Sequence, residues 1–164
     1  MGLRWDESYL GQLRALAGDR TLIAMGGCGV VRDEDGRVLL IRRSDNGRWA
    51  FPSGTMELGE TVRDCAIREL WEETGLVAEA VTPFGLYSDP GHHPEPNMYG
   101  FSYQHITLAC RVDSWSGELQ RVTDETTDAV FYPPDELPAG VSVRTRKLIT
   151  DLADFEATGA FTLE

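Results

Sequence analysis

Three glutamates, Glu69, Glu72 and Glu73, lie close together in the chain. If this segment is helical, spacings of three and four residues place their carboxylates on one face. Carboxylates so placed repel one another, and near the C-terminal end of a helix they also oppose the helix dipole. Such a cluster needs a counter-charge. It indicates a hard divalent cation such as Mg²⁺, which proteins bind through carboxylates and substrate phosphates. A solvated acidic helix face is the alternative interpretation.

A helix over residues 61–74 is predicted to hold these carboxylates in place. Its opposite face carries Val62, Ala66 and Leu70, which recur at every fourth position and can pack against a sheet. Gly75 follows and suits the left-handed conformation that ends many helices. The carboxylates are therefore expected to project from a helix that is anchored along its apolar side.

The segment around the glutamates matches a longer pattern, G-x5-E-x7-R-E-U-x-E-E-x-G-U, in which U is an aliphatic residue. The matching residues are Gly54, Glu60, Arg68, Glu69, Leu70, Glu72, Glu73, Gly75 and Leu76. This pattern is the Nudix box, so the chain resembles the Nudix hydrolase family. The resemblance extends to the preceding VLLIRRSDNGRWAFPSG and to the later DETTDAVFYPPDELP, and it covers roughly residues 22–137. A match of this length makes a merely solvated acidic face a very weak interpretation.

The resemblance implies both a reaction and a metal. Nudix hydrolases cleave a nucleoside diphosphate linked to another moiety, with water attacking a phosphorus atom. By similarity, Mg²⁺ or Mn²⁺ is expected at five residues, the first through its backbone carbonyl: Ser53, Glu60, Glu69, Glu72 and Glu73. Arg68 is expected to orient a neighbouring carboxylate, and Arg68, Glu69 and Glu73 are the catalytic residues that the box implies. Many members have glycine in place of Ser53, but a carbonyl ligand does not depend on the side chain.

Two residues outside the box are further candidates. By resemblance, Glu125 is the candidate general base from a later loop, and an ordinary turn acid before a strand is an equally good interpretation. Arg43 ends a strand just before the box and could bind a substrate phosphate or base, although strand-end arginines are more often solvated. His92 and His93 lie in a Pro- and Gly-rich segment that is expected to be a surface loop, with a substrate lid as the alternative.

The remaining sequence predicts the elements that must position these residues. A short amphipathic helix is expected over residues 6–17, with Leu10 and Leu16 among its apolar positions. Ser142 is suited to cap a last helix. A turn at residues 33–36 is expected to join the first two strands as a hairpin. Strands are predicted over residues 22–31, 37–43, 77–87, 101–112 and 126–132.

This order of elements predicts an α/β (α+β) fold with a mixed sheet between helices. The resemblance implies the Nudix fold with an extra N-terminal helix. Residues 1–20 are then a helical extension and residues 21–164 the Nudix hydrolase domain, within a single domain overall.

Composition excludes several other classes of protein. The chain has 164 residues, with 15 Lys and Arg against 27 Asp and Glu, a net charge of −12. So acidic a chain is a poor nucleic-acid binder. The longest apolar stretch is too short to span a membrane, and no signal peptide is recognised. Three cysteines without C-x-x-C spacing favour a reducing, cytoplasmic location. A homodimer is expected by resemblance only.

Several functions fit the box. The first prediction is metal-dependent hydrolysis of the pyrophosphate bond in a nucleoside diphosphate derivative, of the ADP-ribose, nucleotide-sugar or CDP-alcohol type. A MutT-like pyrophosphatase acting on nucleoside triphosphates, including oxidised ones, is the alternative within enzymes. A Nudix-fold module that senses a nucleotide without turnover is the alternative from another class. The presence of every box carboxylate argues against that last alternative.

Overall fold

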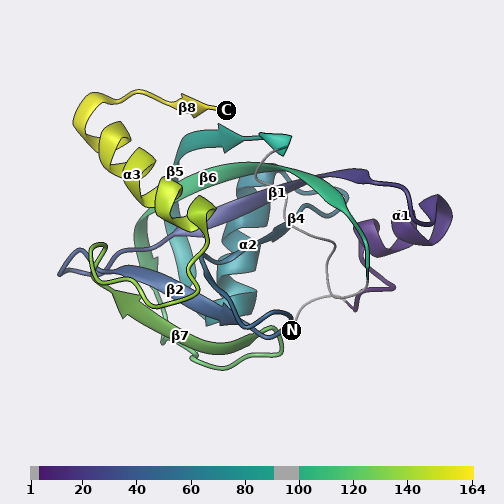
Figure 1. The fold of residues 1–164 in the computed structure, drawn as a ribbon. Helices are drawn as coiled ribbons and strands as arrows, with labels where there is room; N and C mark the ends of the chain where they lie inside the picture. The colour runs from purple at the N-terminus through teal and green to yellow at the C-terminus, as the bar shows by residue number, and fades with distance from the viewer. Residues whose placement is uncertain (1–3, 91–99) are drawn as a thin grey trace.

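Helices α2 (Val62–Thr74) and α3 (Val143–Thr158) cover opposite faces of the larger β-sheet (Figure 1). Strand β1 (Leu22–Val30) lies between them, and its side chains alternate in direction. Cys28 packs with Leu148 and Leu152 of α3. Its neighbour Gly27 lies so close to α2 that a Cβ atom there would be 2.5 Å from the Ala66 nitrogen. Glycine in β1 therefore allows α2 to approach the sheet closely.

The strands within the described parts of this computed structural model, residues 4–90 and 100–164, form two sheets. The larger sheet has the order β4-β1-β6-β5-β8, and the smaller one has the order β3-β2-β7. In the larger sheet, β1 runs parallel to β6 and β5 runs parallel to β8. The other strands are β2 (Val38–Arg43), β3 (Trp49–Ala50), β4 (Ser53–Thr55), β5 (Val77–Tyr87), β6 (Tyr103–Ser116), β7 (Thr126–Tyr132) and β8 (Thr162–Leu163). His92 and His93 lie outside the described residues.

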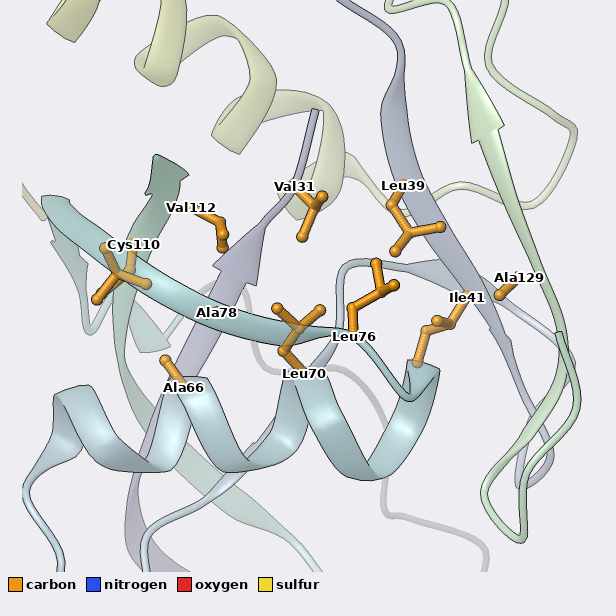
Figure 2. Close-up of a cluster of buried hydrophobic side chains, with 11 residues drawn as sticks. Val31, Leu39, Ile41, Ala66, Leu70, Leu76, Ala78, Cys110, Val112 and Ala129 are labelled. Atoms are coloured by element: carbon orange, nitrogen blue, oxygen red, sulfur yellow. The ribbon is translucent and has the colours of Figure 1, made fainter. Parts of the chain in front are cut away.

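The apolar side of α2 is buried in a cluster that joins the two sheets (Figure 2). Ala66 and Leu70 point from the helix toward the strands, and Leu39 and Ile41 of β2 belong to the same cluster. Both α2 residues are almost completely buried. Burying a leucine side chain stabilises a fold by about 1.5–3 kcal/mol. This packing fixes the rotation of α2 and so fixes the direction of its acidic face.

The mixed α/β class predicted from the sequence is confirmed, and the limits of β5 and β7 agree with the prediction. The predicted turn at residues 33–36 is also present, with Gly36 at a φ of 77° and a bridge between Arg32 and Val38. The prediction of a simple hairpin is wrong, however. Strand β1 continues between β4 and β6, whereas β2 pairs with β3 and β7. The two strands separate because each pairs over a longer stretch with a strand of its own sheet, β1 with β6 and β2 with β7.

Helix α1 (Tyr9–Ala17) begins later than predicted and buries only part of the expected apolar side, including Leu10. Leu16, expected on the apolar side, is 86% exposed, and Arg14 is buried instead. The Arg14 guanidinium lies over the rings of Phe101 and Tyr103 and donates hydrogen bonds to backbone carbonyls, including that of Ser102. An arginine can be buried when its donors are satisfied and its plane stacks on aromatic rings.

Three short strands, β3, β4 and β8, were not predicted. Strand β4 has three residues with a glycine at its centre, so it carries no alternating pattern. It exists because Ser53 and Gly54 pair with Cys28 and Gly27 of β1. This pairing places the start of the Nudix-like motif beside α2.

None of the helices within residues 4–90 and 100–164 has the length and apolar character that a membrane span requires.

The three cysteines are free and buried. Burial raises the pKa of Cys28 and of Cys65 to about 12 and that of Cys110 to about 11. They are therefore neutral core thiols.

Candidate active site

Both ends of helix α2 are fixed by local hydrogen bonds. At the N-terminal end, the Thr61 hydroxyl accepts from the Asp64 amide, and the Asp64 carboxylate accepts from the Thr61 amide in return. At the C-terminal end, Gly75 is left-handed, with a φ of 74°, and its amide donates to the Trp71 carbonyl. These caps fix the residues at which α2 begins and ends, so that the acidic residues lie within the helix.

Arg68 lies at the centre of the acidic face. Its guanidinium donates two hydrogen bonds to Glu60, of 2.8 and 3.0 Å. It also donates to Glu69 at 2.7 Å and to Glu72 at 2.9 Å. A fourth acceptor, the carbonyl of Thr55 at 3.0 Å, ties the same guanidinium to β4. Arg68 thus joins three of the predicted metal ligands in one charged network, and its hydrogen bonds to Glu60 raise its own pKa.

The Glu69 carboxylate lies directly against the backbone of β4. A Cβ atom built on Gly54 would be 2.2 Å from the Glu69 Cδ and Oε1 atoms, so only glycine leaves room for this side chain. Glu69 is buried, and burial raises its pKa to about 7 despite the opposing charge of Arg68. Glycine is therefore required at position 54, the first position of the box, because the Glu69 carboxylate lies so close to the backbone there.

Glu73 is the most buried member of the cluster, with 1% of its surface exposed. Its Oε2 atom accepts a hydrogen bond of 2.8 Å from the Ser53 amide. Its Oε1 atom has no hydrogen-bond partner among the described residues, and the nearest cation, Nη1 of Arg43, is 3.7 Å away. Burial raises the pKa of Glu73 to about 8. A buried carboxylate oxygen left unpaired in this way is costly unless a ligand completes it.

Arg43 and Glu125 reach the cluster from the smaller sheet. Arg43 ends β2 and is held by two hydrogen bonds to Asp45, which leave it next to Glu73. The Ser44 amide donates to the Glu125 carbonyl, which ties the loop before β7 to the end of β2. The negative charge of Glu125 contributes to the raised pKa values of Glu69 and Glu73, so this exposed side chain lies in their vicinity.

A cavity of about 260 Å³ adjoins the outer edge of the cluster. It is lined by Trp71, Glu72, Gly75, Gln120, Thr123, Asp124 and Glu125. Sequence reasoning did not identify Asp45 or Asp124 as part of this region. The sequence offers little that could have indicated them: Asp45 lies two residues after Arg43, and Asp124 lies next to Glu125.

The predicted metal ligands are thus neighbours around Arg68 and β4. Within residues 4–90 and 100–164, however, no three acidic, histidine or cysteine side chains are gathered closely enough to hold an ion as they stand. Arg68 itself engages three of the carboxylates, those of Glu60, Glu69 and Glu72. The donors available are carboxylate oxygens, which suit Mg²⁺ or Mn²⁺, and the unpaired oxygen of Glu73 fits a metal ligand.

Comparisons with known proteins identify relatives of this chain. The family model of the NUDIX domain matches residues 24–152. A MutT-like protein of Streptomyces ambofaciens is 37% identical over 109 residues, which are 66% of this chain and 63% of that protein. An ADP-ribose pyrophosphatase of Methanocaldococcus jannaschii is 34% identical over 109 residues, which are 65% of this chain and 60% of that protein. The chain therefore spans somewhat less than two thirds of the length of either relative.

A solved structure shows the same fold. The MutT NUDIX hydrolase from Burkholderia pseudomallei superposes with a TM-score of 0.65 at 23% identity, over 81% of this chain and 99% of that one. At this level of identity the likeness concerns the fold alone. It agrees with the arrangement of sheets and helices described above.

Proposed function

This chain belongs to the Nudix family, and we propose that it is a metal-dependent hydrolase of a pyrophosphate bond in a nucleoside diphosphate derivative. Water would add to one phosphorus atom while the bond from that phosphorus to the bridging oxygen breaks. The products would be a nucleoside monophosphate and the phosphorylated second moiety. The reaction needs no oxidant and no covalent enzyme intermediate.

The observation that carries this proposal is the unpaired oxygen of Glu73. A fully buried carboxylate with one satisfied and one unsatisfied oxygen is costly in a structural role. The same arrangement is useful for binding a metal, because the Ser53 amide orients the carboxylate and leaves its other oxygen free. Glu73 therefore has the geometry of a metal ligand that is already oriented before the ion binds.

The other residues of the site would share the remaining tasks. Glu69, Glu72 and Glu60, with the backbone carbonyl of Ser53, would complete the ligands for Mg²⁺ or Mn²⁺. Such ions offset the charge of a diphosphate and lower the pKa of a bound water. Arg68 would keep the carboxylates in place. Arg43 would bind a phosphate group of the substrate.

Glu125 would accept a proton as the general base. Its carboxylate is exposed beside the cavity that adjoins Glu72, so water can reach it. A general base of this kind has to lie within hydrogen-bond reach of the attacking water, or one water away. The anchoring of its loop to Ser44 supports such a position.

The substrate class is proposed as a nucleoside diphosphate linked to a second moiety, such as ADP-ribose, a nucleotide sugar or a CDP-alcohol. The name of the Methanocaldococcus relative supports the ADP-ribose type. The name of the Streptomyces relative, a MutT-like protein, supports a nucleoside triphosphate pyrophosphatase as the second candidate.

A substrate panel tests the proposal and separates the two candidates. The protein is incubated with ADP-ribose, UDP-glucose, CDP-choline, dATP and 8-oxo-dGTP, each with Mg²⁺, with Mn²⁺ or with EDTA. Ion-exchange chromatography then identifies the products. We expect a nucleoside monophosphate and a phosphate monoester from one of the first three compounds, only when metal is present. Pyrophosphate from a triphosphate would favour the second candidate, and metal binding without any turnover would favour a sensor.

A further inference from the structure

Helix α1 contacts the loop between β4 and α2 through the charged side chain of Glu57. The backbone amide of Tyr9, the first residue of α1, donates a hydrogen bond of 2.7 Å to the Glu57 carboxylate. The first amides of a helix have no acceptor within the helix, and the helix dipole favours a negative charge there. Glu57 lies in the loop between β4 and α2, 48 residues away in sequence, so this contact is purely tertiary.

The contact continues as a chain of hydrogen bonds into the acidic cluster. The backbone amide of Glu57 donates to the Glu60 carboxylate at 2.7 Å. Glu60 in turn accepts two hydrogen bonds from Arg68, which also holds Glu69. Burial alone would raise the pKa of Glu60, but the hydrogen bonds from Arg68 and the Glu57 amide lower it. Two hydrogen bonds, joined through the covalent structure of Glu57, therefore connect α1 to Glu60, one of the predicted metal ligands.

Helix α1 is itself firmly attached to the sheet. Arg14 is buried between two aromatic rings, those of Phe101 and Tyr103, and has four hydrogen-bond acceptors. Two of these acceptors are the carbonyls of Gly18 and Arg20, which follow the helix. The others are the Tyr103 hydroxyl of β6 and the carbonyl of Ser102, which directly precedes β6. A guanidinium fixed in this way holds α1 against β6, so the helix can serve as a fixed support for the loop.

We propose that Glu57 is a positioning residue through which helix α1 sets the conformation of the metal-binding loop, residues 56–60. This inference rests on the proposed function, because it assigns the cluster around Arg68 to metal binding. The N-terminal helix is then part of the site's support rather than an accessory. Loss of the contact should loosen the loop and weaken metal binding, while α1 and the sheet remain folded.

A proline substitution at Tyr9 tests the contact with a matched control. Tyr9→Pro removes the amide donor, and proline is well tolerated at the first position of a helix. The preceding Ser8 has a φ of −67° and a ψ of 151°, which suits a residue before proline. Tyr9→Ala also loses the partly exposed ring but keeps the amide. The difference between the two variants therefore reports the hydrogen bond alone.

The readouts do not depend on turnover. Mn²⁺ affinity is measured by the electron paramagnetic resonance signal of free Mn²⁺, and loop opening by amide hydrogen exchange over residues 55–60. We expect Tyr9→Pro to bind Mn²⁺ about 3- to 10-fold more weakly than Tyr9→Ala, since one partly exposed, charge-assisted hydrogen bond is lost. Exchange in the loop should rise by a similar factor. Equal affinity and equal exchange in the two variants would overturn the proposal.

A double-mutant cycle distinguishes the loss of the contact between Tyr9 and Glu57 from a general loss of stability. Glu57→Ala should weaken Mn²⁺ binding about as much as Tyr9→Pro, and the double variant should be no worse than either single one. Glu57→Gln keeps an acceptor oxygen and should fall between wild type and Glu57→Ala. Additive losses in the double variant would contradict a shared mechanism. If wild type binds Mn²⁺ but hydrolyses no substrate, the proposed function fails and the positioning proposal can still be judged.

Discussion

Helices α2 and α3 each present a buried carboxylate to the sheet, and the two carboxylates differ in how they are satisfied. Asp151 of α3 accepts a hydrogen bond of 2.8 Å from the Tyr87 hydroxyl and pairs with Lys147 at 3.1 Å. Glu73 of α2 has one hydrogen bond, from the Ser53 amide, and one oxygen without a hydrogen-bond partner among the described residues, with Nη1 of Arg43 3.7 Å away. The first arrangement is complete in the folded chain, whereas the second is complete only with a ligand.

This difference separates a structural acid from a functional one. Completing both oxygens of a buried carboxylate contributes to stability, because no desolvated charge is left unpaired. Leaving one oxygen free costs stability and provides a binding site. The charges nearby agree with this distinction, since Lys147 also bridges Asp151 to Glu164, while the Arg43 guanidinium donates its hydrogen bonds to Asp45 and lies 3.7 Å from the Glu73 Oε1 atom.

The strongest test of the comparison is to neutralise each carboxylate. Glu73→Gln should lower kcat/KM by about 100- to 1000-fold, because the proposed metal site loses its most buried anionic ligand. Asp151→Asn is the matched control, and its kcat/KM should stay within about 3-fold of wild type. The substrate identified from the panel serves for both measurements.

Stability should respond in the opposite order. Asp151→Asn should lower the free energy of unfolding by about 1–3 kcal/mol, since it weakens the contacts to Tyr87 and Lys147. Glu73→Gln in EDTA should leave that free energy unchanged or raise it. Denaturant unfolding of both variants measures these effects. Full activity in Glu73→Gln would remove the basis for the distinction between the two helices.

The stability of the protein should depend on pH through Glu73. The pKa of Glu73 is raised from 4.5 to about 8 by burial, so the folded protein binds a proton more tightly than the unfolded chain. The resulting stabilisation is fully present below pH 4.5 and is lost as the pH rises toward 8. In EDTA, the free energy of unfolding of wild type should therefore fall by about 1–3 kcal/mol, relative to Glu73→Gln, between pH 5 and pH 9.

Added metal should reverse this trend. A divalent ion replaces the proton on Glu73, so its binding should tighten over the same pH range and restore stability at high pH. Wild type and Glu73→Gln are compared in EDTA and in saturating Mn²⁺ by denaturant unfolding. A difference between them that does not change with pH would show that Glu73 is not held protonated in the folded protein.

The sequence alone could predict the acidic face of α2 because its information is local. The spacing of Glu69 and Glu73, the apolar stripe of Ala66 and Leu70, and the cap at Gly75 are all encoded within one helix. The fold class followed from the order of such local patterns. Spacing also predicted that Glu69 and Glu73 share a face, but it did not predict that both would be buried.

What sequence reasoning missed depends on tertiary contacts. The burial of Arg14 requires two aromatic rings that lie far along the chain, so the helical pattern wrongly favoured Leu16. The contact between Tyr9 and Glu57 uses a backbone amide, which leaves no trace in residue type. The division of β1 and β2 between two sheets is decided by their partners rather than by the turn that joins them.

The smallest effect is expected at Glu125, which represents a third kind of carboxylate. It is exposed, lies beside the cavity that adjoins Glu72, and has neither the complete pairing of Asp151 nor the buried free oxygen of Glu73. Glu125→Gln should lower kcat by about 10-fold and leave Mn²⁺ affinity nearly unchanged, as expected for a proton acceptor that is not a metal ligand. The test is the pH profile of kcat: a general base is inactive when protonated, so loss of the acidic limb in the variant supports the assignment. A weaker Mn²⁺ affinity would instead place Glu125 among the ligands, and unchanged kcat and affinity would leave it an ordinary turn residue before β7.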